Sequence, residues 1–249
     1  MTNLLEINNL SVDFPSRRGQ VAAVNKVSIT VAKGEVLGLV GESGAGKSTV
    51  GNSIINLLEP PGYISGGEII FDGNRIDQLS NEEMRKIRGA KIGTIFQDPQ
   101  TSLNPLMTIG KQLSETLIET LKISGSSARE KSIELLDSVG IPNPEPRLDA
   151  YPHQFSGGMR QRVVIALALA GDPDLIIADE PTTALDVSIQ KQILDLIKSL
   201  CKQRNLGVII VTHDIGVIAE IADRVAVMYN GQLVEAGEVK QVLQKPKHE

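Results

Sequence analysis

A glycine-rich loop between an apolar run and an amphipathic segment is the feature that most constrains this chain. Residues 41–48 read Gly-Glu-Ser-Gly-Ala-Gly-Lys-Ser, which matches the pattern G-x-x-x-x-G-K-[ST]. Before the loop, residues 36–40 form the continuous apolar run of a strand buried on both faces. After it, residues 47–58 carry apolar side chains at helical spacing. In this order of strand, loop and helix, the loop turns its backbone N–H groups around phosphate groups.

Two side chains at the end of the loop have roles in phosphate chemistry. Lys47 can reach the terminal phosphates of a nucleotide, and the Ser48 hydroxyl can ligate Mg²⁺. The alternative is a plain connection between strand and helix, in which Lys47 and Ser48 are solvated. We favour phosphate binding because the whole pattern stands in the required context. Kinases, GTPases and every other class of phosphate-loop NTPase remain open at this point.

Alternating strands and helices predict the fold class. Residues 175–178, 208–211 and 225–229 are apolar runs typical of buried strands. Between the first two, apolar residues in 189–200 form one face of a helix. This alternation predicts an α/β protein with a mainly parallel sheet and helices on both of its faces.

Two other parts of the chain differ from this pattern. The first hundred residues read mostly as strands, in which apolar and polar residues alternate. Residues 98 to about 170 read as helices, and we expect them to form a helical subdomain inserted into the α/β part. Within it, we expect residues 125–127 to separate two helices and the proline-rich residues 141–152 to form a largely extended linker.

Composition excludes several classes of protein. The chain has 249 residues, a formal net charge of −5 and no tryptophan, which argues against non-specific binding to nucleic acid. Its single cysteine, Cys201, excludes a disulfide framework. No apolar run approaches the roughly 18 residues of a membrane-spanning helix, and residues 1–6 lack the features of a secretory signal. We therefore expect a soluble cytosolic protein.

Two carboxylates follow the apolar run at residues 175–178. Asp179 and Glu180 stand at the carboxyl end of that predicted strand, which is where ligands bind in open α/β sheets. Asp179 can hold Mg²⁺, and Glu180 can polarise an attacking water, either as a general base or by positioning the water. The alternative is an acidic pair that complements the dipole of a following helix. The phosphate loop makes the first interpretation the stronger one.

Two further motifs have both a structural and a functional interpretation. Ser156, Gly157 and Gly158 can present a hydroxyl and N–H groups to an anion, although a serine followed by two glycines is also a plausible helix N-cap. His213 follows the predicted strand 208–211 and can donate a hydrogen bond to a phosphate oxygen, although a single histidine at a strand end is more often structural.

The order of these motifs resembles that of the ATP-binding cassette (ABC) transporter ATPase family, over residues 4 to about 247. The sequence has, in order, the phosphate loop, Gln97 after a strand, the peptide Ser156-Gly157-Gly158, the acidic strand end, the loop Ala184-Leu185-Asp186, and His213. Kinases and small GTPases lack this peptide and the helical insert that carries it. Within the family, residues 96–105, 151–162 and 178–187 look like those of the ATPase subunits of oligopeptide and dipeptide permeases.

The resemblance implies the ABC ATPase fold: one ATP-binding domain over residues 1–249, with a phosphate-loop NTPase core, an antiparallel β subdomain and the helical subdomain at about 98–170. Phe155 and Met159 replace the ends of the family's usual Leu-Ser-Gly-Gly-Gln peptide. Because the three central residues are intact, we expect a competent site. Some relatives carry a C-terminal extension with a cysteine-ligated iron–sulfur cluster, which we do not expect in a chain with one cysteine.

The resemblance also implies a role for each site residue. We expect catalysis by Glu180, His213 and Gln97, and magnesium ligation by Ser48, Gln97 and Asp179. We expect Ser156, Gly157 and Gly158 to complete the site of an opposite subunit, and Asp186 to lie at the dimer seam. Phe14, after the first strand, is the candidate for stacking on adenine, with a core phenylalanine as the alternative. The residues expected to bind ATP are Phe14, Ser43, Gly44, Ala45, Gly46, Lys47, Ser48 and Thr49.

The function implied is hydrolysis of Mg-ATP that powers an ABC importer, with di- and oligopeptides as solutes. The partners implied are an identical or homologous ATPase subunit, transmembrane permease subunits and, indirectly, a solute-binding protein. No nucleic acid is expected. The location implied is peripheral, on the cytoplasmic face of the inner or plasma membrane. The alternatives are a nickel or glutathione importer ATPase, a soluble ABC ATPase of translation or DNA repair, and a non-catalytic nucleotide-binding regulator.

Overall fold

The computed structural model describes residues 3–16, 19–183 and 185–247. The chain divides into two compact units, which are described in turn. The first comprises Met1–Arg85 and Leu200–Glu249, and the second comprises Lys86–Ser199. Helices α2 (Asn81–Ile87) and α8 (Val187–Arg204) carry the chain across the boundary between them.

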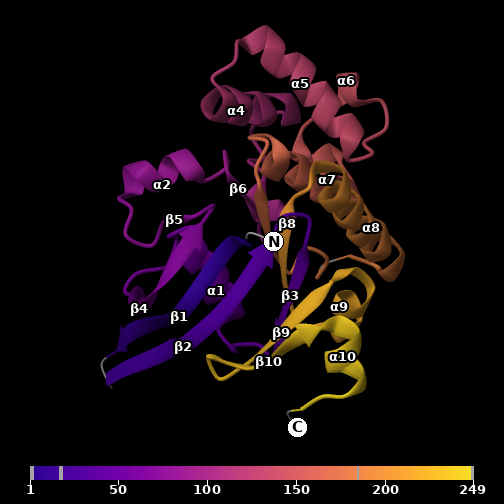
Figure 1. Ribbon diagram of the computed structural model, residues 1–249. Helices are drawn as coiled ribbons and strands as arrows, with labels where there is room; N and C mark the ends of the chain where they lie inside the picture. The colour runs from indigo at the N-terminus through magenta and orange to yellow at the C-terminus, as the bar shows by residue number, and fades with distance from the viewer. Residues whose placement is uncertain (1–2, 17–18, 184, 248–249) are drawn as a thin grey trace. The chain divides into compact units, whose positions relative to one another are not determined.

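An antiparallel sheet fills much of the first unit. Its strand order is β2-β1-β4-β5, and the strands run side by side in Figure 1. Leu5 and Ile7 of β1 are fully buried, because alternate residues of the strand face the core, as the sequence pattern predicted. The pairing with β2 shifts register after Ile7, and Leu10 is fully buried as well. The strand bounds are Asn3–Ser16 for β1, Gly19–Ala32 for β2, Tyr63–Phe71 for β4 and Asn74–Arg75 for β5.

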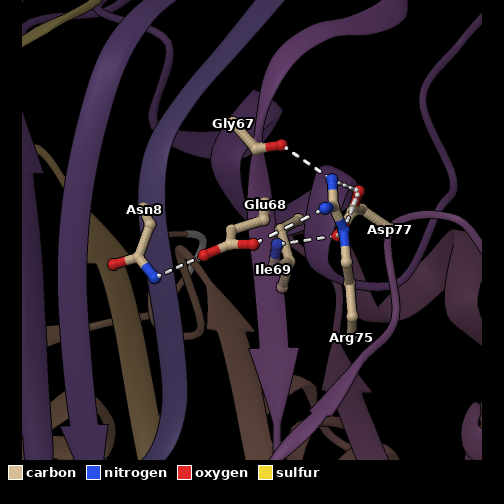
Figure 2. Close-up of polar contacts among 6 residues, drawn as sticks. All are labelled: Asn8, Gly67, Glu68, Ile69, Arg75 and Asp77. Atoms are coloured by element: carbon tan, nitrogen blue, oxygen red, sulfur yellow. Dashed lines mark hydrogen bonds and ion pairs between the residues drawn. The ribbon is translucent and has the colours of Figure 1, made fainter.

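A polar network closes the end of this sheet (Figure 2). The Asp77 side chain is 5% exposed. It accepts a 2.8 Å hydrogen bond from the backbone N–H of Ile69 and forms a 2.9 Å ion pair with Arg75. The hydrogen bond to Asp77 raises the pKa of the Arg75 guanidinium, which also donates to the carbonyl of Gly67. Arg75 lies 3.5 Å from Glu68 as well, but that pair is exposed. The Asp77 carboxylate thus accepts the N–H of Ile69 in place of a backbone carbonyl from a neighbouring strand.

The parallel strands of the first unit position the phosphate loop. The strand order is β10-β9-β3-β8, in which β3 pairs in parallel with β9 and with β8. Residues 36–40 are buried throughout, as expected for a central strand. The hairpin predicted at Gly231 joins β9 to β10. The bounds are Val36–Gly41 for β3, Gly207–Thr212 for β8, Arg224–Tyr229 for β9 and Gln232–Glu238 for β10.

The helix after the phosphate loop is shorter than predicted. Helix α1 spans Lys47–Ile54, whereas the apolar spacing predicted a helix to residue 58. Asn56 adopts a left-handed conformation with φ 50°, and the N–H of Leu57 turns back to the carbonyl of Asn52. This is a helix C-cap, which apolar spacing does not reveal. The unit also contains α9 (Ile215–Ile221) and α10 (Val239–Gln244).

The second unit is mainly helical around two parallel strands, β6 (Ile92–Ile95) and β7 (Leu175–Asp179). Helix α7 contacts β6, α3, α4 and α5, so the segment after Ser156 is the centre of this unit. Figure 1 shows α4, α5 and α6 lying together. The bounds are Pro99–Ser102 for α3, Ile109–Leu121 for α4, Gly125–Ser138 for α5, Pro144–Arg147 for α6, Pro152–Gln154 for the 3₁₀ helix η1 and Gly157–Leu169 for α7.

Two predictions about this unit were wrong in detail. Residues 125–127 do not separate two helices but form the first turn of α5, because the Ser124 hydroxyl accepts the N–H of Ser127 as an N-cap. The linker at 141–152 is not largely extended, because Pro144 opens α6 and Pro152 opens η1. Proline fits the first turn of a helix, where its missing N–H has no intrahelical partner.

Among the described helices, none combines the length and apolar character needed to cross a membrane.

Candidate functional site

The phosphate loop has the backbone that its sequence requires. Gly44 has φ 81° and Gly46 has φ 93°, both in the region that favours glycine. A Cβ on Gly46 would collide with the carbonyl oxygen of Ala23, whereas one on Gly44 would meet nothing within 4 Å. Gly46 is also the N-cap of α1, and it has no side chain that could cover the first N–H groups of the helix. The loop is therefore shaped as an anion cradle.

Lys47 lies over the phosphate loop. The residue is 6% exposed, and its Nζ donates 2.8 Å hydrogen bonds to the carbonyl oxygens of Gly41 and Glu42. A buried ammonium group held by the loop's own carbonyls is positioned for an anion bound in the cradle. Ser43, Gly44 and Ser48 are exposed, Ala45 is buried and Thr49 is half-buried. The structure thus fits phosphate groups at this loop.

The acidic pair ends the strand β7. Asp179 is the last residue of β7, and Glu180 follows it with φ 46°. A non-glycine residue in this conformation costs about 1–3 kcal/mol, and such strain often occurs at functional sites. Both residues are half-buried. The predicted position of the two carboxylates at the carboxyl end of a buried strand is confirmed.

Two donors meet on one oxygen of Glu180. The Gln97 Nε2 donates a 3.0 Å hydrogen bond to Glu180 Oε2, and the Thr183 Oγ1 donates a 2.8 Å bond to the same oxygen. Gln97 follows β6, the parallel partner of β7, so the ends of the two strands bring these residues together. Gln97 is therefore hydrogen-bonded to Glu180 of the acidic pair within the second unit.

The peptide at residues 156–158 is a helix N-terminus. The Ser156 Oγ accepts the N–H of Met159 at 3.3 Å and caps α7. The structural interpretation of Ser156 as an N-cap is therefore correct, and it leaves the exposed residue at the positive end of a helix. A Cβ on Gly158 would come within 2.7 Å of the Ile189 side chain of α8, so only glycine packs there without a shift.

Asp186 stands at the start of α8. Its Oδ1 accepts the N–H of Ile189 at 2.9 Å, and the residue is exposed. Ala184, in the same predicted loop, lies outside the described residues. The packing of Gly158 on Ile189 links the loop at Asp186 to the start of α7 within the second unit.

His213 and Phe14 belong to the first unit. His213 is exposed and follows β8 directly, and its neighbour Asp214 caps α9 through the N–H groups of Gly216 and Val217. Phe14 does not follow the first strand, as predicted, but lies inside β1 opposite Val21. The strand continues because it stays paired with β2 to Ser16. Phe14 is half-buried.

The three residues predicted to ligate magnesium carry suitable donor atoms. The Ser48 hydroxyl, the Gln97 amide and the Asp179 carboxylate supply the oxygen ligands that Mg²⁺ prefers. No group of three or more His, Cys, Asp or Glu able to hold a metal occurs within residues 3–16, 19–183 and 185–247. A magnesium ion bound mainly through substrate phosphates needs only one or two protein carboxylates, and Asp179 is a carboxylate of that kind.

Sequence reasoning missed Thr183. The residue stands three positions after Glu180 in a turn rich in threonine, and a hydroxyl at that offset is the available signal. Cys201 is not a further candidate. Its thiol is buried and contacts the carbonyl oxygen of Leu206 at 3.0 Å, and burial raises its pKa to about 11, so it is not a nucleophile at neutral pH.

Comparison with known sequences identifies relatives over the whole chain. A family described as ABC transporter matches residues 24–183. The chain is 53% identical to the oligopeptide transport ATP-binding protein OppD of Bacillus subtilis (strain 168), over 100% of the chain and 70% of that protein. It is 51% identical to the dipeptide transport ATP-binding protein DppD of the same organism, over 100% of the chain and 74% of that protein.

Comparison with solved structures agrees. The dimeric structure of the ATP-binding cassette MJ0796 bound to ADP and Pi has a TM-score of 0.82 and 31% identity, over 94% of this chain and 98% of that one. The structure of cbiO1 from Clostridium perfringens, part of the ABC transporter complex cbiONQ, has a TM-score of 0.84 and 29% identity, over 98% of this chain and 92% of that one. The predicted ABC ATPase fold is confirmed.

Proposed function

The chain belongs to the ABC transporter family, and from this premise we propose that it is the ATP-hydrolysing subunit of an importer for di- and oligopeptides. The observation that carries the proposal is the identity of 53% and 51% to oligopeptide and dipeptide transport ATP-binding proteins over the whole chain. As an ABC ATPase, the chain binds ATP and couples its hydrolysis to transport. We treat residues 1–249 as one ATP-binding domain with a helical subdomain at about 98–170.

The phosphate loop binds the nucleotide. Ser43, Gly44, Ala45 and Gly46 surround the phosphates with backbone N–H groups, and Ser48 and Thr49 add hydroxyl groups from the first turn of α1. Lys47 exchanges its bonds to the loop carbonyls for bonds to phosphate oxygens, which keeps its charge paired after binding. Phe14 stacks on adenine from β1.

Catalysis depends on the groups at the carboxyl ends of β6, β7 and β8. Ser48, Gln97 and Asp179 hold Mg²⁺, which neutralises charge on the phosphates when it is bound. Glu180 accepts a proton from the attacking water as general base. His213 donates a hydrogen bond to the terminal phosphate and steadies the charge that develops there.

A second copy or a homologous subunit completes each site. Ser156, Gly157 and Gly158 contact the nucleotide of the opposite subunit with the N-terminus of α7, and Asp186 lies at the dimer seam. ATP is then part of the interface, so its binding favours the closed dimer, and hydrolysis removes that contribution. The dimeric MJ0796 cassette supports this arrangement.

The subunit acts at a membrane without entering it. The transmembrane permease subunits contact this chain around Gln97 and the helices that follow, on the cytoplasmic face of the membrane. A solute-binding protein delivers the peptide to those subunits. The membership of cbiO1 in a transporter complex supports a peripheral location.

Purification from membranes tests the proposal. A tagged copy of the chain, expressed in its own organism and extracted with mild detergent, should bring down transmembrane subunits identified by mass spectrometry. The deletion strain should lose uptake of labelled di- and oligopeptides. If the deletion strain loses uptake of nickel or glutathione and keeps uptake of peptides, that compound is the solute of the importer. Co-purification with ribosomes or DNA-repair proteins would reject a role in transport.

A further inference from the structure

Glu180 is held at both its backbone and its side chain. Its positive φ of 46° directs the residue out of the line of β7, and the turn that follows is closed by a 3.3 Å hydrogen bond from the N–H of Thr183 to the carbonyl of Glu180. The same threonine returns with its hydroxyl, which donates a 2.8 Å bond to the Glu180 Oε2. Thr183 therefore bonds to both the backbone carbonyl and the side-chain carboxylate of Glu180.

The two donors on Oε2 differ in what they depend on. Gln97 reaches Glu180 from another strand end, 83 residues away in the sequence. In the proposed function Gln97 also ligates magnesium through its amide oxygen, so Gln97 serves the metal as well as Glu180. Thr183 is three residues from Glu180 in the same turn. Its hydrogen bond is made within a single turn and serves only Glu180 in the proposed function.

Accepting hydrogen bonds on one oxygen restricts the torsions of a carboxylate side chain. An exposed glutamate samples many rotamers, and a base must hold its oxygen toward the proton that it accepts. A bond from a hydroxyl to a carboxylate is charge-assisted and therefore stronger than a neutral one. Thr183 is exposed, so packing against the core does not explain its position.

We infer that Thr183 is a positioning residue for the Glu180 carboxylate, which it orients for proton transfer from water. The inference rests on the proposed function, in which Glu180 is the general base. Thr183 does not contact nucleotide in this role, and it acts only through Glu180. Its loss should therefore slow the chemical step and leave ATP binding unchanged.

Two variants and a control test the inference. Thr183→Val keeps the shape of the side chain and removes the hydroxyl, whereas Thr183→Ser keeps the hydroxyl. We expect Thr183→Val to lower kcat for ATP hydrolysis by about 10-fold to 100-fold, the worth of one hydrogen bond to a charged group, with KM for ATP within about twofold of wild type. We expect Thr183→Ser to restore kcat to within about threefold of wild type.

The control is Ser16→Ala. Ser16 is also exposed, and its hydroxyl donates a 2.7 Å bond to a backbone carbonyl, that of Gly19, and not to a carboxylate. Its kcat should match wild type. Thermal unfolding of each variant shows that the protein measured is folded, and Thr183→Ser supplies a second, milder substitution at the same site.

The outcomes separate the inference from the proposed function. Wild-type kcat in Thr183→Val, equal losses in the valine and serine variants, or a loss confined to KM would overturn the positioning role. Glu180→Gln, measured beside them, tests the general base itself. If Glu180→Gln is inactive and Thr183→Val is fully active, only the inference fails; if Glu180→Gln hydrolyses ATP at the wild-type rate, the assignment of Glu180 fails with it.

Discussion

Gln97 donates a 3.0 Å hydrogen bond from its side-chain amide to the carboxylate of Glu180. Each residue lies just beyond the carboxyl end of a parallel strand, and the pairing of β6 with β7 brings the two ends to one edge. An amide has two functional ends, so Gln97 can donate to Glu180 through its nitrogen and still offer its oxygen to a metal. The contact connects a proposed magnesium ligand directly to the proposed base.

Replacement of Glu180 by glutamine should abolish turnover but not binding. The amide cannot accept a proton at neutral pH, so we expect ATP hydrolysis to fall by on the order of 10²–10⁴, while ATP still binds and holds the dimer closed. Phosphate release and analytical gel filtration with Mg-ATP measure the two effects. Glu134→Gln, at an exposed carboxylate of α5, should change neither. Hydrolysis near the wild-type rate in Glu180→Gln would reject Glu180 as the base.

Replacement of Lys47 by alanine should weaken nucleotide affinity. The variant loses a buried ammonium that reaches the loop, so we expect the Kd for ATP to rise by about 10-fold to 100-fold, the worth of a hydrogen bond to a charged group. Isothermal titration calorimetry measures the change. Lys240→Ala, an exposed lysine of α10, is the matched control. Unchanged affinity in Lys47→Ala would remove the phosphate loop from the binding site.

Two glycines of the phosphate loop should respond differently to alanine. Gly44→Ala meets open space and suffers only the cost of a positive φ, about 1–2 kcal/mol. Gly46→Ala suffers that cost and also a collision with the carbonyl of Ala23, so it should be destabilised more and bind ATP more weakly. Urea unfolding of the two variants gives the comparison. Equal losses of stability would mean that the loop moves away from Ala23 easily.

Loss of the Asp77 carboxylate should destabilise the protein more than loss of the exposed Glu68 carboxylate. Asp77→Ala leaves the N–H of Ile69 and the Arg75 guanidinium without their carboxylate partner, so we expect a loss of about 1–3 kcal/mol in the free energy of unfolding. Asp77→Asn should lose less, because its oxygen can still accept the N–H of Ile69. Glu68→Ala removes the exposed ion pair with Arg75 and a 3.1 Å hydrogen bond from the Asn8 side chain, and it should cost about 1 kcal/mol, less than Asp77→Ala. A reversed order would contradict the role of Asp77.

Local sequence determined the elements on which the candidate site stands. The phosphate loop, the buried strands and the acidic strand end were predicted because each depends on residues that are close in sequence. The boundaries were harder, since a left-handed Asn56 ends α1 and a Ser124 cap starts α5, and neither changes the apolar period. The proline content of residues 141–152 predicted an extended linker. The linker contains helical turns instead, because Pro144 and Pro152 occupy first-turn positions.

Only the tertiary structure decided which of these residues meet. Sequence placed Gln97 and Glu180 after separate strands, and strand pairing made them partners. The turn that brings Thr183 onto Glu180 requires a backbone conformation that glutamate rarely adopts, so no propensity predicts it. A motif records the chemical groups that a site needs, whereas the directions of those groups depend on contacts that form only when distant segments pack together.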